Sequence, residues 1–170
     1  MKVPQERYRC FEFYGDNNWH SYMRVSDADL SLKDPFAEGV ADLNNQWAMS
    51  NNESINSQAG SGYYVVMSNS NYNVHSSHAI MYVTFYTNNT YTFKIMNRAE
   101  GNYDYPTITL SDGTTLYSNK ANTTSFTSFT VSSAQGKTMT VDFRKDGSSN
   151  TDLDRAFLAI PNEISSVINY

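Results

Sequence analysis

Oxygen-bearing side chains recur at every second position of the segment 146–154. A calcium loop uses this rhythm to turn its ligands inward. The rest of that motif is missing, because Thr151 stands at the position of the sharp-turn glycine and Phe157 at that of the bidentate glutamate. The segment therefore predicts either a loop capped by side-chain hydrogen bonds or a structural calcium ion with four ligands: Asp146, Asn150, Asp152 and Asp154.

Aromatic side chains among many asparagines and serines could bind a sugar. An aromatic ring offers rigid apolar area with a polar tip, which suits the apolar face of a sugar ring. Aromatic residues are also normal in strands, where they pack in the core. Both roles remain open for the three candidates, which are Trp47, Tyr72 and Tyr103.

Other catalytic or metal-binding patterns are missing from the sequence. His75 and His78 are three residues apart, and in an extended segment this spacing points the two side chains to opposite faces, so we expect no metal site there. No glycine-rich phosphate loop, nucleophile elbow or His–Glu zinc helix occurs. Nothing marks a pocket that would separate the pKa values of two catalytic carboxylates. We expect no enzyme and no cofactor, with the structural calcium ion kept only as the alternative to a capped loop.

The composition excludes several classes of protein. The formal net charge is −5 without a lysine–arginine cluster, so the basic surface that a nucleic-acid binder needs is missing. Cys10 is the only cysteine, which rules out a disulfide within the chain. No segment approaches the ~20 apolar residues that span a bilayer, and the first residues lack the apolar run of a secretory signal. We expect neither nucleic acid nor a membrane as a partner.

The elements that position these residues are strands. Apolar residues alternate with polar ones, as in Ala79, Met81 and Val83, and strand side chains alternate between two faces. The connector 87–89 is short enough for a hairpin. The charged residues Arg98, Glu100, Asp104, Arg144 and Arg155 could form ion pairs at one end of the sheets. The pattern predicts an all-β antiparallel sandwich of jelly-roll or Greek-key type, with strands at 63–67, 78–86, 90–97, 105–111, 126–132, 138–144 and 155–160.

The N-terminal region has a different pattern. A strand is expected at 7–14, and 19–25 is either a second strand or an extended arm. Asp34 before Pro35 predicts the start of one short helix. The segment 51–62 is rich in turn formers and predicts a loop. We therefore expect three parts: an N-terminal arm with a short helix at 1–57, the sandwich at 58–163 and a C-terminal tail at 164–170.

Four segments carry a resemblance to a known family. They are His75 to Val83, Tyr91 to Ile95, Arg98 to Tyr105, and Phe143 to Asn150 continuing through Asp154-Arg155 to Ile160-Pro161. Together they resemble a β-sandwich module of virion proteins in crAss-like phages of gut Bacteroidales, where it occurs in tail, fibre and capsid-associated chains. The resemblance covers about 63–161, and none of its motifs is catalytic.

This resemblance implies a phage structural protein that is made in the host cytoplasm and displayed on the outer surface of the virion. A small capsid-decorating or head-fibre protein is expected, with capsid or fibre subunits as partners and with a possible homo-oligomeric state. The sequence pattern assigns docking to the N-terminal region, with Trp19, Tyr22 and Phe36 as candidate residues. The alternative function is a carbohydrate-binding or receptor-adhesion module that contacts host or mucus glycans.

Overall fold

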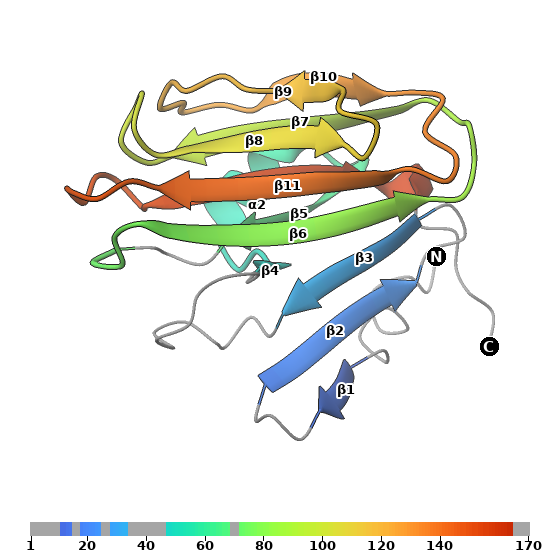
Figure 1. Ribbon diagram of the computed structural model, residues 1–170, viewed down its shortest axis with the longest axis horizontal. Coiled ribbons are helices and arrows are strands. Elements are labelled where there is room, and N and C mark those ends of the chain that lie inside the picture. The colour runs from blue at the N-terminus through green and yellow to red at the C-terminus, as the bar shows by residue number, and fades with distance from the viewer. Residues whose placement is uncertain (1–10, 15–17, 25–27, 34–46, 69–71, 165–170) are drawn as a thin grey trace.

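Two antiparallel sheets lie face to face in the computed structural model of this chain (Figure 1), which describes residues 11–14, 18–24, 28–33, 47–68 and 72–164. The predicted antiparallel β-sandwich is therefore confirmed. Each of the seven strands predicted between residues 63 and 160 is present, and every predicted end lies within one residue of the observed one. The alternation of apolar and polar residues was sufficient to place them.

The larger sheet has seven strands in the order β1-β2-β3-β6-β11-β8-β9. Their bounds are Phe11–Tyr14, Asn18–Arg24, Ala28–Lys33, Ser77–Phe85, Thr138–Lys145, Tyr105–Leu110 and Thr115–Tyr117. The smaller sheet has five strands in the order β10-β7-β12-β5-β4. Their bounds are Thr127–Val131, Tyr91–Arg98, Arg155–Pro161, Tyr63–Ser68 and Trp47–Met49. A short 3-10 helix, η2, follows at Asn162–Ile164.

The main core fills the space between the sheets. On β6 and β11 every second residue is buried, including Met81, Val83 and Val141. The facing sheet contributes aromatic rings, and Phe93 stacks on Phe129 with ring centroids 5.4 Å apart. Offset aromatic pairs of this kind add to the stabilisation from burial. The outer face of β11 carries polar residues, as expected for a sheet with one solvated face.

A second core lies on the other side of the five-stranded sheet, under the helix α2 (Glu53–Ala59). The Asn52 side chain caps this helix by accepting a hydrogen bond from the backbone N–H of Ile55 at 3.1 Å. Ile55 and Ala59 are buried against the sheet. The predicted loop at 51–62 was therefore wrong. The many turn formers in this segment masked the helix signal, which consists of only two apolar residues, Ile55 and Ala59. Residues four apart lie on the same face of a helix, so these two are enough to pack it on the sheet.

The connector 87–89 does not form the predicted hairpin. It carries the chain from β6 in the seven-stranded sheet to β7 in the five-stranded sheet. Each strand already has two partners, β3 and β11 for β6 and β10 and β12 for β7. Strands β6 and β7 both turn their apolar faces toward the same core. Two strands joined by a short crossing between sheets therefore have the same sequence pattern as a hairpin.

The sandwich begins before the predicted boundary at residue 58. Strand β3 pairs with β6, and β4 pairs with β5. Trp47 in β4 is fully buried in the main core, and α2 contributes to the second one. Ile164, assigned to the tail, is also buried. The predicted helix after Asp34, together with Phe36, lies outside the described residues.

The N-terminal strand pair, β1 and β2, extends the larger sheet beyond the sandwich (Figure 1). Three residues of β3, Ala28 to Leu30, pair with β6, while residues 31–33 pair only with β2. The sheet therefore diverges from the sandwich within β3. Of the two alternatives for 19–25, a strand and an extended arm, the structure has the strand, β2. Among the described helices, none is long and apolar enough to cross a membrane.

Candidate functional site

Three connecting loops meet at one end of the sandwich, which we call the charged end: residues 72–76, 99–104 and 146–154. Backbone and side-chain hydrogen bonds join them. Ser76 N–H donates to the Asp146 carbonyl at 2.6 Å, and Asn73 N–H donates to Asn150 Oδ1 at 2.7 Å. The backbone has positive φ at six non-glycine residues here, namely Asn73, Ser76, Asn102, Ser149, Asp152 and Asp154. Such conformations persist only where surrounding contacts enforce them.

A buried ionic network holds the charged end together. The side chains of Lys145, Asp104 and Asp154 are all 0% exposed. The Lys145 ammonium lies 3.3 Å from Asp104 Oδ2 and 3.1 Å from Asp154 Oδ2, and it donates to the Ser149 carbonyl at 2.6 Å. Buried charges are tolerated when they are paired. Of the two carboxylates, Asp104 also accepts a hydrogen bond from the ammonium, whereas Asp154 Oδ2 is at ion-pair distance without one. The lysine thus links β11 to the loops on either side of it.

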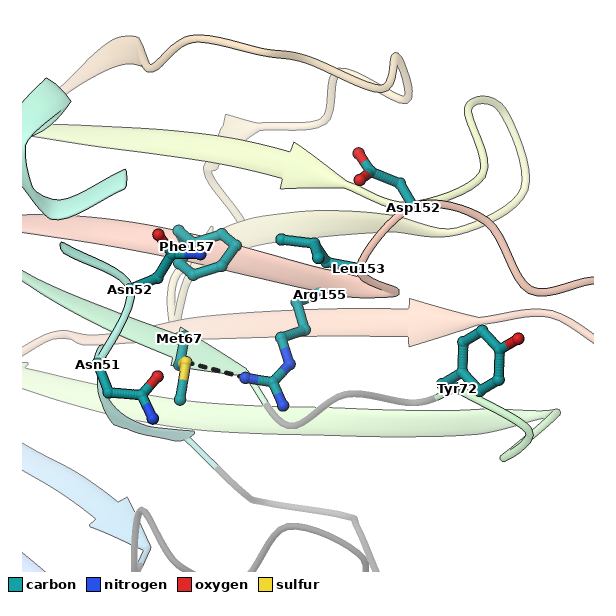
Figure 2. A pocket seen from close by; sticks show the side chains of 8 residues that line it. All are labelled: Asn51, Asn52, Met67, Tyr72, Asp152, Leu153, Arg155 and Phe157. Atoms are coloured by element: carbon teal, nitrogen blue, oxygen red, sulfur yellow. Dashed lines mark hydrogen bonds between the residues drawn. The ribbon is translucent and has the colours of Figure 1, made fainter. Parts of the chain in front are cut away.

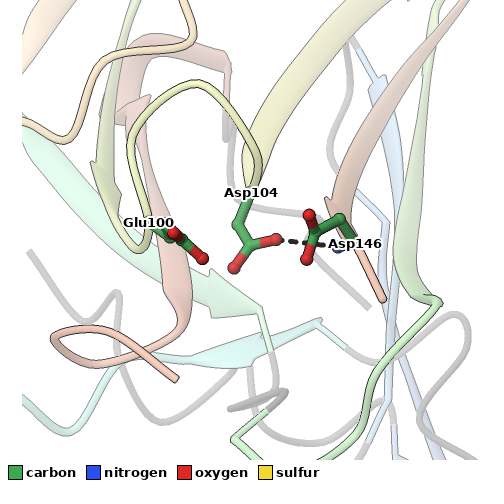
Figure 3. Close-up of side chains that lie close together, drawn as sticks. All are labelled: Glu100, Asp104 and Asp146. Atoms are coloured by element: carbon green, nitrogen blue, oxygen red, sulfur yellow. Dashed lines mark hydrogen bonds between the residues drawn. The ribbon is translucent and has the colours of Figure 1, made fainter. Parts of the chain in front are cut away.

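Glu100, Asp104 and Asp146 form an acidic cluster beside this network (Figure 3). One carboxylate oxygen from each lies within 4.8 Å of the others. Asp104 Oδ1 accepts a hydrogen bond from Asp146 N–H at 2.7 Å, and Glu100 Oε2 is buried without a hydrogen-bond partner among the described residues. Carboxylate oxygens suit a hard cation, although three are fewer than the 6–8 ligands that calcium takes.

The four residues predicted to bind calcium do not converge on one point. Asp146 Oδ1 accepts a hydrogen bond from Ser148 N–H at 2.9 Å, which is the capping arrangement given above as the alternative to calcium. The Asn150 amide donates to Asn73 Oδ1 at 2.6 Å, whereas Asp154 faces Lys145. Asp152 forms a bidentate salt bridge with Arg98, in which Arg98 Nη2 donates to Asp152 Oδ1 at 2.8 Å and Nε donates to Oδ2. The Arg98 guanidinium holds the pKa of the Asp152 carboxyl below its ordinary value.

The three predicted sugar-binding residues lie in different places. Trp47 is 0% exposed, and its indole N–H donates to the Ala79 carbonyl at 2.9 Å, so the prediction that it binds a sugar at the surface was wrong. Tyr72 and Tyr103 are each 55% exposed. Tyr72 lines the pocket described next, and Tyr103 is not among the residues that line it. Tyr72 and Tyr103 are therefore accessible to a ligand, and Tyr72 also lies beside a cavity.

This pocket has a volume of about 270 Å³ and lies where the charged end meets the start of α2 (Figure 2). Met67, Leu153 and Phe157 provide apolar surface, while Asn51, Asp152 and Arg155 provide polar groups. The Arg155 guanidinium donates to Met67 Sδ at 3.0 Å. The lining comes from four separate parts of the chain: 51–52, 67, 72 and 152–157.

Comparison with protein-family models, with curated proteins and with solved structures found no match to this chain.

The structure places two of the three candidate docking residues. Trp19 and Tyr22 lie in β2, where their backbones pair with Phe13 of β1 and Ser31 of β3. The Lys145 network was missed by sequence reasoning, although a signal was present. Lys145 continues the inward period-two series of Met139, Val141 and Phe143, so its side chain had to point into the protein and find anions there.

Proposed function

We propose that this chain is a structural protein of a bacteriophage particle, displayed as a β-sandwich and attached through its N-terminal strand pair. Three observations support the proposal: the resemblance of 63–161 to a module of phage virion proteins, the sandwich fold, and the extension of the seven-stranded sheet beyond the five-stranded one. The role is passive, since it requires strand pairing and apolar burial at repeated interfaces and neither catalysis nor a cofactor.

The sheet extension is the observation that carries the proposal. Strand β1 ends the seven-stranded order, so within the described residues its outer edge has no strand partner. The extensive contacts of β1 are with β2, and those of β2 are with β1 and β3. An edge strand of this kind is a template for pairing with another chain. A capsid or fibre subunit that adds a strand to β1, or a layer over β1 and β2, would complete the sheet.

The proposed arrangement leaves the sandwich outermost on the particle. The charged end and the outer face of β6, β11 and β8 then face the medium. That face carries polar and aromatic side chains, including Tyr82 at 42% exposed. Other virion subunits are the partners in this proposal, and neither nucleic acid nor a membrane takes part.

The test is to delete residues 1–24, which removes β1 and β2 and keeps the β3–β6 pairing, and to measure incorporation into particles. Purified particles of the phage or prophage that encodes the chain are analysed by quantitative mass spectrometry. We expect the wild-type chain at a fixed copy number and the truncated chain to be missing from the particles. Tyr82→Ala, a surface change on β6, is the control and should incorporate normally.

Two results would overturn the proposal. One is a wild-type chain that is made during infection yet does not occur in purified particles. The other is a truncated chain that incorporates at the wild-type copy number. The unfolding midpoint of the purified truncated chain, measured in urea, shows whether the deletion has damaged the sandwich itself.

A further inference from the structure

The pocket beside α2 has the chemistry of a sugar site. We propose that it binds one neutral pyranose unit of a glycan, with Tyr72 as the wall on which the sugar ring packs. This inference goes beyond attachment to a particle, because the pocket and the N-terminal strand pair share no residue.

Tyr72 supplies most of the apolar surface that a sugar ring could contact. Met67 and Phe157, which are 3% and 1% exposed, form the buried base of the pocket, with Leu153 beside them. Tyr72 also lines the pocket and has more than half of its surface exposed, and in the view of Figure 2 Arg155 lies between it and Met67. A pyranose presents C–H groups on its face, and aromatic rings provide rigid area for such groups at low entropic cost.

The polar groups around this surface can both donate and accept hydrogen bonds. Asp152 offers acceptors, Asn51 offers an amide with both functions, and Arg155 offers donors. Each sugar hydroxyl also donates and accepts. A few placed polar groups around an apolar surface are typical of small-ligand sites, and here they surround an aromatic wall.

The charges at the opening favour a ligand without charge. Asp152 is negative and Arg155 positive, and both line the same pocket. An anionic ligand would meet the Asp152 carboxylate, while a cationic ligand would meet the Arg155 guanidinium. Both side chains also have partners within the protein, Arg98 for Asp152 and the Met67 sulfur for Arg155, so neither presents an unpaired charge to a ligand. A neutral, hydroxyl-rich ligand can use both side chains without opposing either.

Size and rigidity also fit a single sugar ring. The volume of about 270 Å³ is just below the roughly 300 Å³ at which pockets for drug-sized ligands begin. Asp152 is fixed by its two hydrogen bonds to Arg98, and Phe157 is fixed in the second core. A preformed site loses little side-chain entropy on binding. The longer glycan would extend from the pocket into solvent past Tyr72.

The test titrates the full-length ¹⁵N-labelled chain with methyl glycosides of glucose, galactose, mannose and N-acetylglucosamine, and with methyl glucuronide as a charged probe. We expect at least one neutral glycoside to shift the amide signals of Leu153 and Phe157, with a dissociation constant of about 1–10 mM, as is reasonable for so small a contact. The glucuronide should bind more weakly than the matching glucoside. Pocket amides that respond to none of the neutral glycosides at about 50 mM would overturn the proposal, and so would a response to the glucuronide alone.

Three tyrosine variants locate the site. Tyr72→Ala should weaken binding about tenfold, because it removes an aromatic wall, whereas Tyr72→Phe keeps the ring and should bind like the wild type. Tyr103→Ala is the matched control, since the two tyrosines are equally exposed and Tyr103 lies outside the pocket. Unchanged binding by Tyr72→Ala contradicts the proposed site. Loss of binding on Tyr103→Ala alone would move the sugar to the 99–104 loop and equally refute it.

Discussion

The charged end and the N-terminal strand pair both extend beyond the main core, yet they are stabilised differently. At the charged end, three loops are joined by a buried lysine, two buried aspartates and several backbone and side-chain hydrogen bonds. The N-terminal strand pair is attached through β3, of which three residues pair with the sandwich. The charged end is stabilised by contacts within the chain. The N-terminal strand pair is joined to the sandwich by strand pairing through β3.

This difference indicates that the charged end is fully structured in the isolated chain, whereas the N-terminal strand pair can still gain contacts from another chain. Buried, paired charges fix the loops at the charged end, as a preformed pocket requires. Within the described residues, β1 ends the seven-stranded sheet, and such an edge is available to a strand of another chain. The predictions below test whether stability resides in the first region and assembly in the second.

The largest effect is expected from Lys145→Met. The change leaves the Asp104 and Asp154 carboxylates buried without their cation. Removing one partner of a buried ion pair costs about 3–5 kcal/mol of unfolding free energy, measured by urea denaturation. Adding Asp104→Asn and Asp154→Asn should recover part of the loss. Lys137→Met breaks the partly exposed pair with Asp112 and is the control. Equal unfolding midpoints for the two lysine variants would contradict the buried network.

The two tryptophans provide the next comparison. Trp47→Phe removes the hydrogen bond to the Ala79 carbonyl and some core volume, and it should lower the unfolding free energy by about 1–3 kcal/mol. Trp19→Phe changes a residue of β2 and should leave the unfolding of the sandwich unaltered. Both values come from urea titrations followed by circular dichroism. A larger loss for Trp19→Phe than for Trp47→Phe would show that the N-terminal strand pair is part of the stable unit.

The smallest effect is a pH dependence at the charged end. Hydrogen bonds from Arg98 lower the pKa of Asp152 from its ordinary value of 3.8. Folding therefore favours the ionised carboxylate, and this contribution is complete at neutral pH and disappears as the pH falls below 3.8 and through the folded-state pKa. Asp152→Asn should cost less than about 1 kcal/mol at pH 7, since solvent screens the pair, and nothing at the acid limit. A difference from wild type that grows on acidification would reverse the sign and refute this assignment.

The sequence predicted the strands well because each strand repeats its signal over several residues. Ala79, Met81, Val83 and Phe85 all report the same buried face. A short connecting segment has no repeated signal of this kind. The sequence of the connector 87–89 fits a hairpin and a crossing between sheets equally well. The helix α2 has two buried residues, too few to outweigh the turn formers around them.

The candidate sites were less predictable because they depend on distant contacts. The pocket combines four segments, and no local pattern links Asn51 to Tyr72 or Arg155. Trp47 and Tyr72 are both aromatic residues in polar surroundings, yet one is fully buried and the other more than half exposed. Tertiary packing decides between these outcomes. By contrast, Lys145 could have been recognised from its inward position in β11.

Amide hydrogen exchange, measured on the free chain and on the chain within purified particles, tests the account most directly. We predict that amides of β1 and β2 exchange much faster than those of β6 and β11 in the free chain, because β1 ends the seven-stranded sheet and the pair is joined to the sandwich through three residues of β3. In particles they should become protected by the neighbouring subunit. Amides of β1 and β2 that are already as slow as those of β11 in the free chain, or that remain fast in particles, would contradict the assignment of this strand pair to docking.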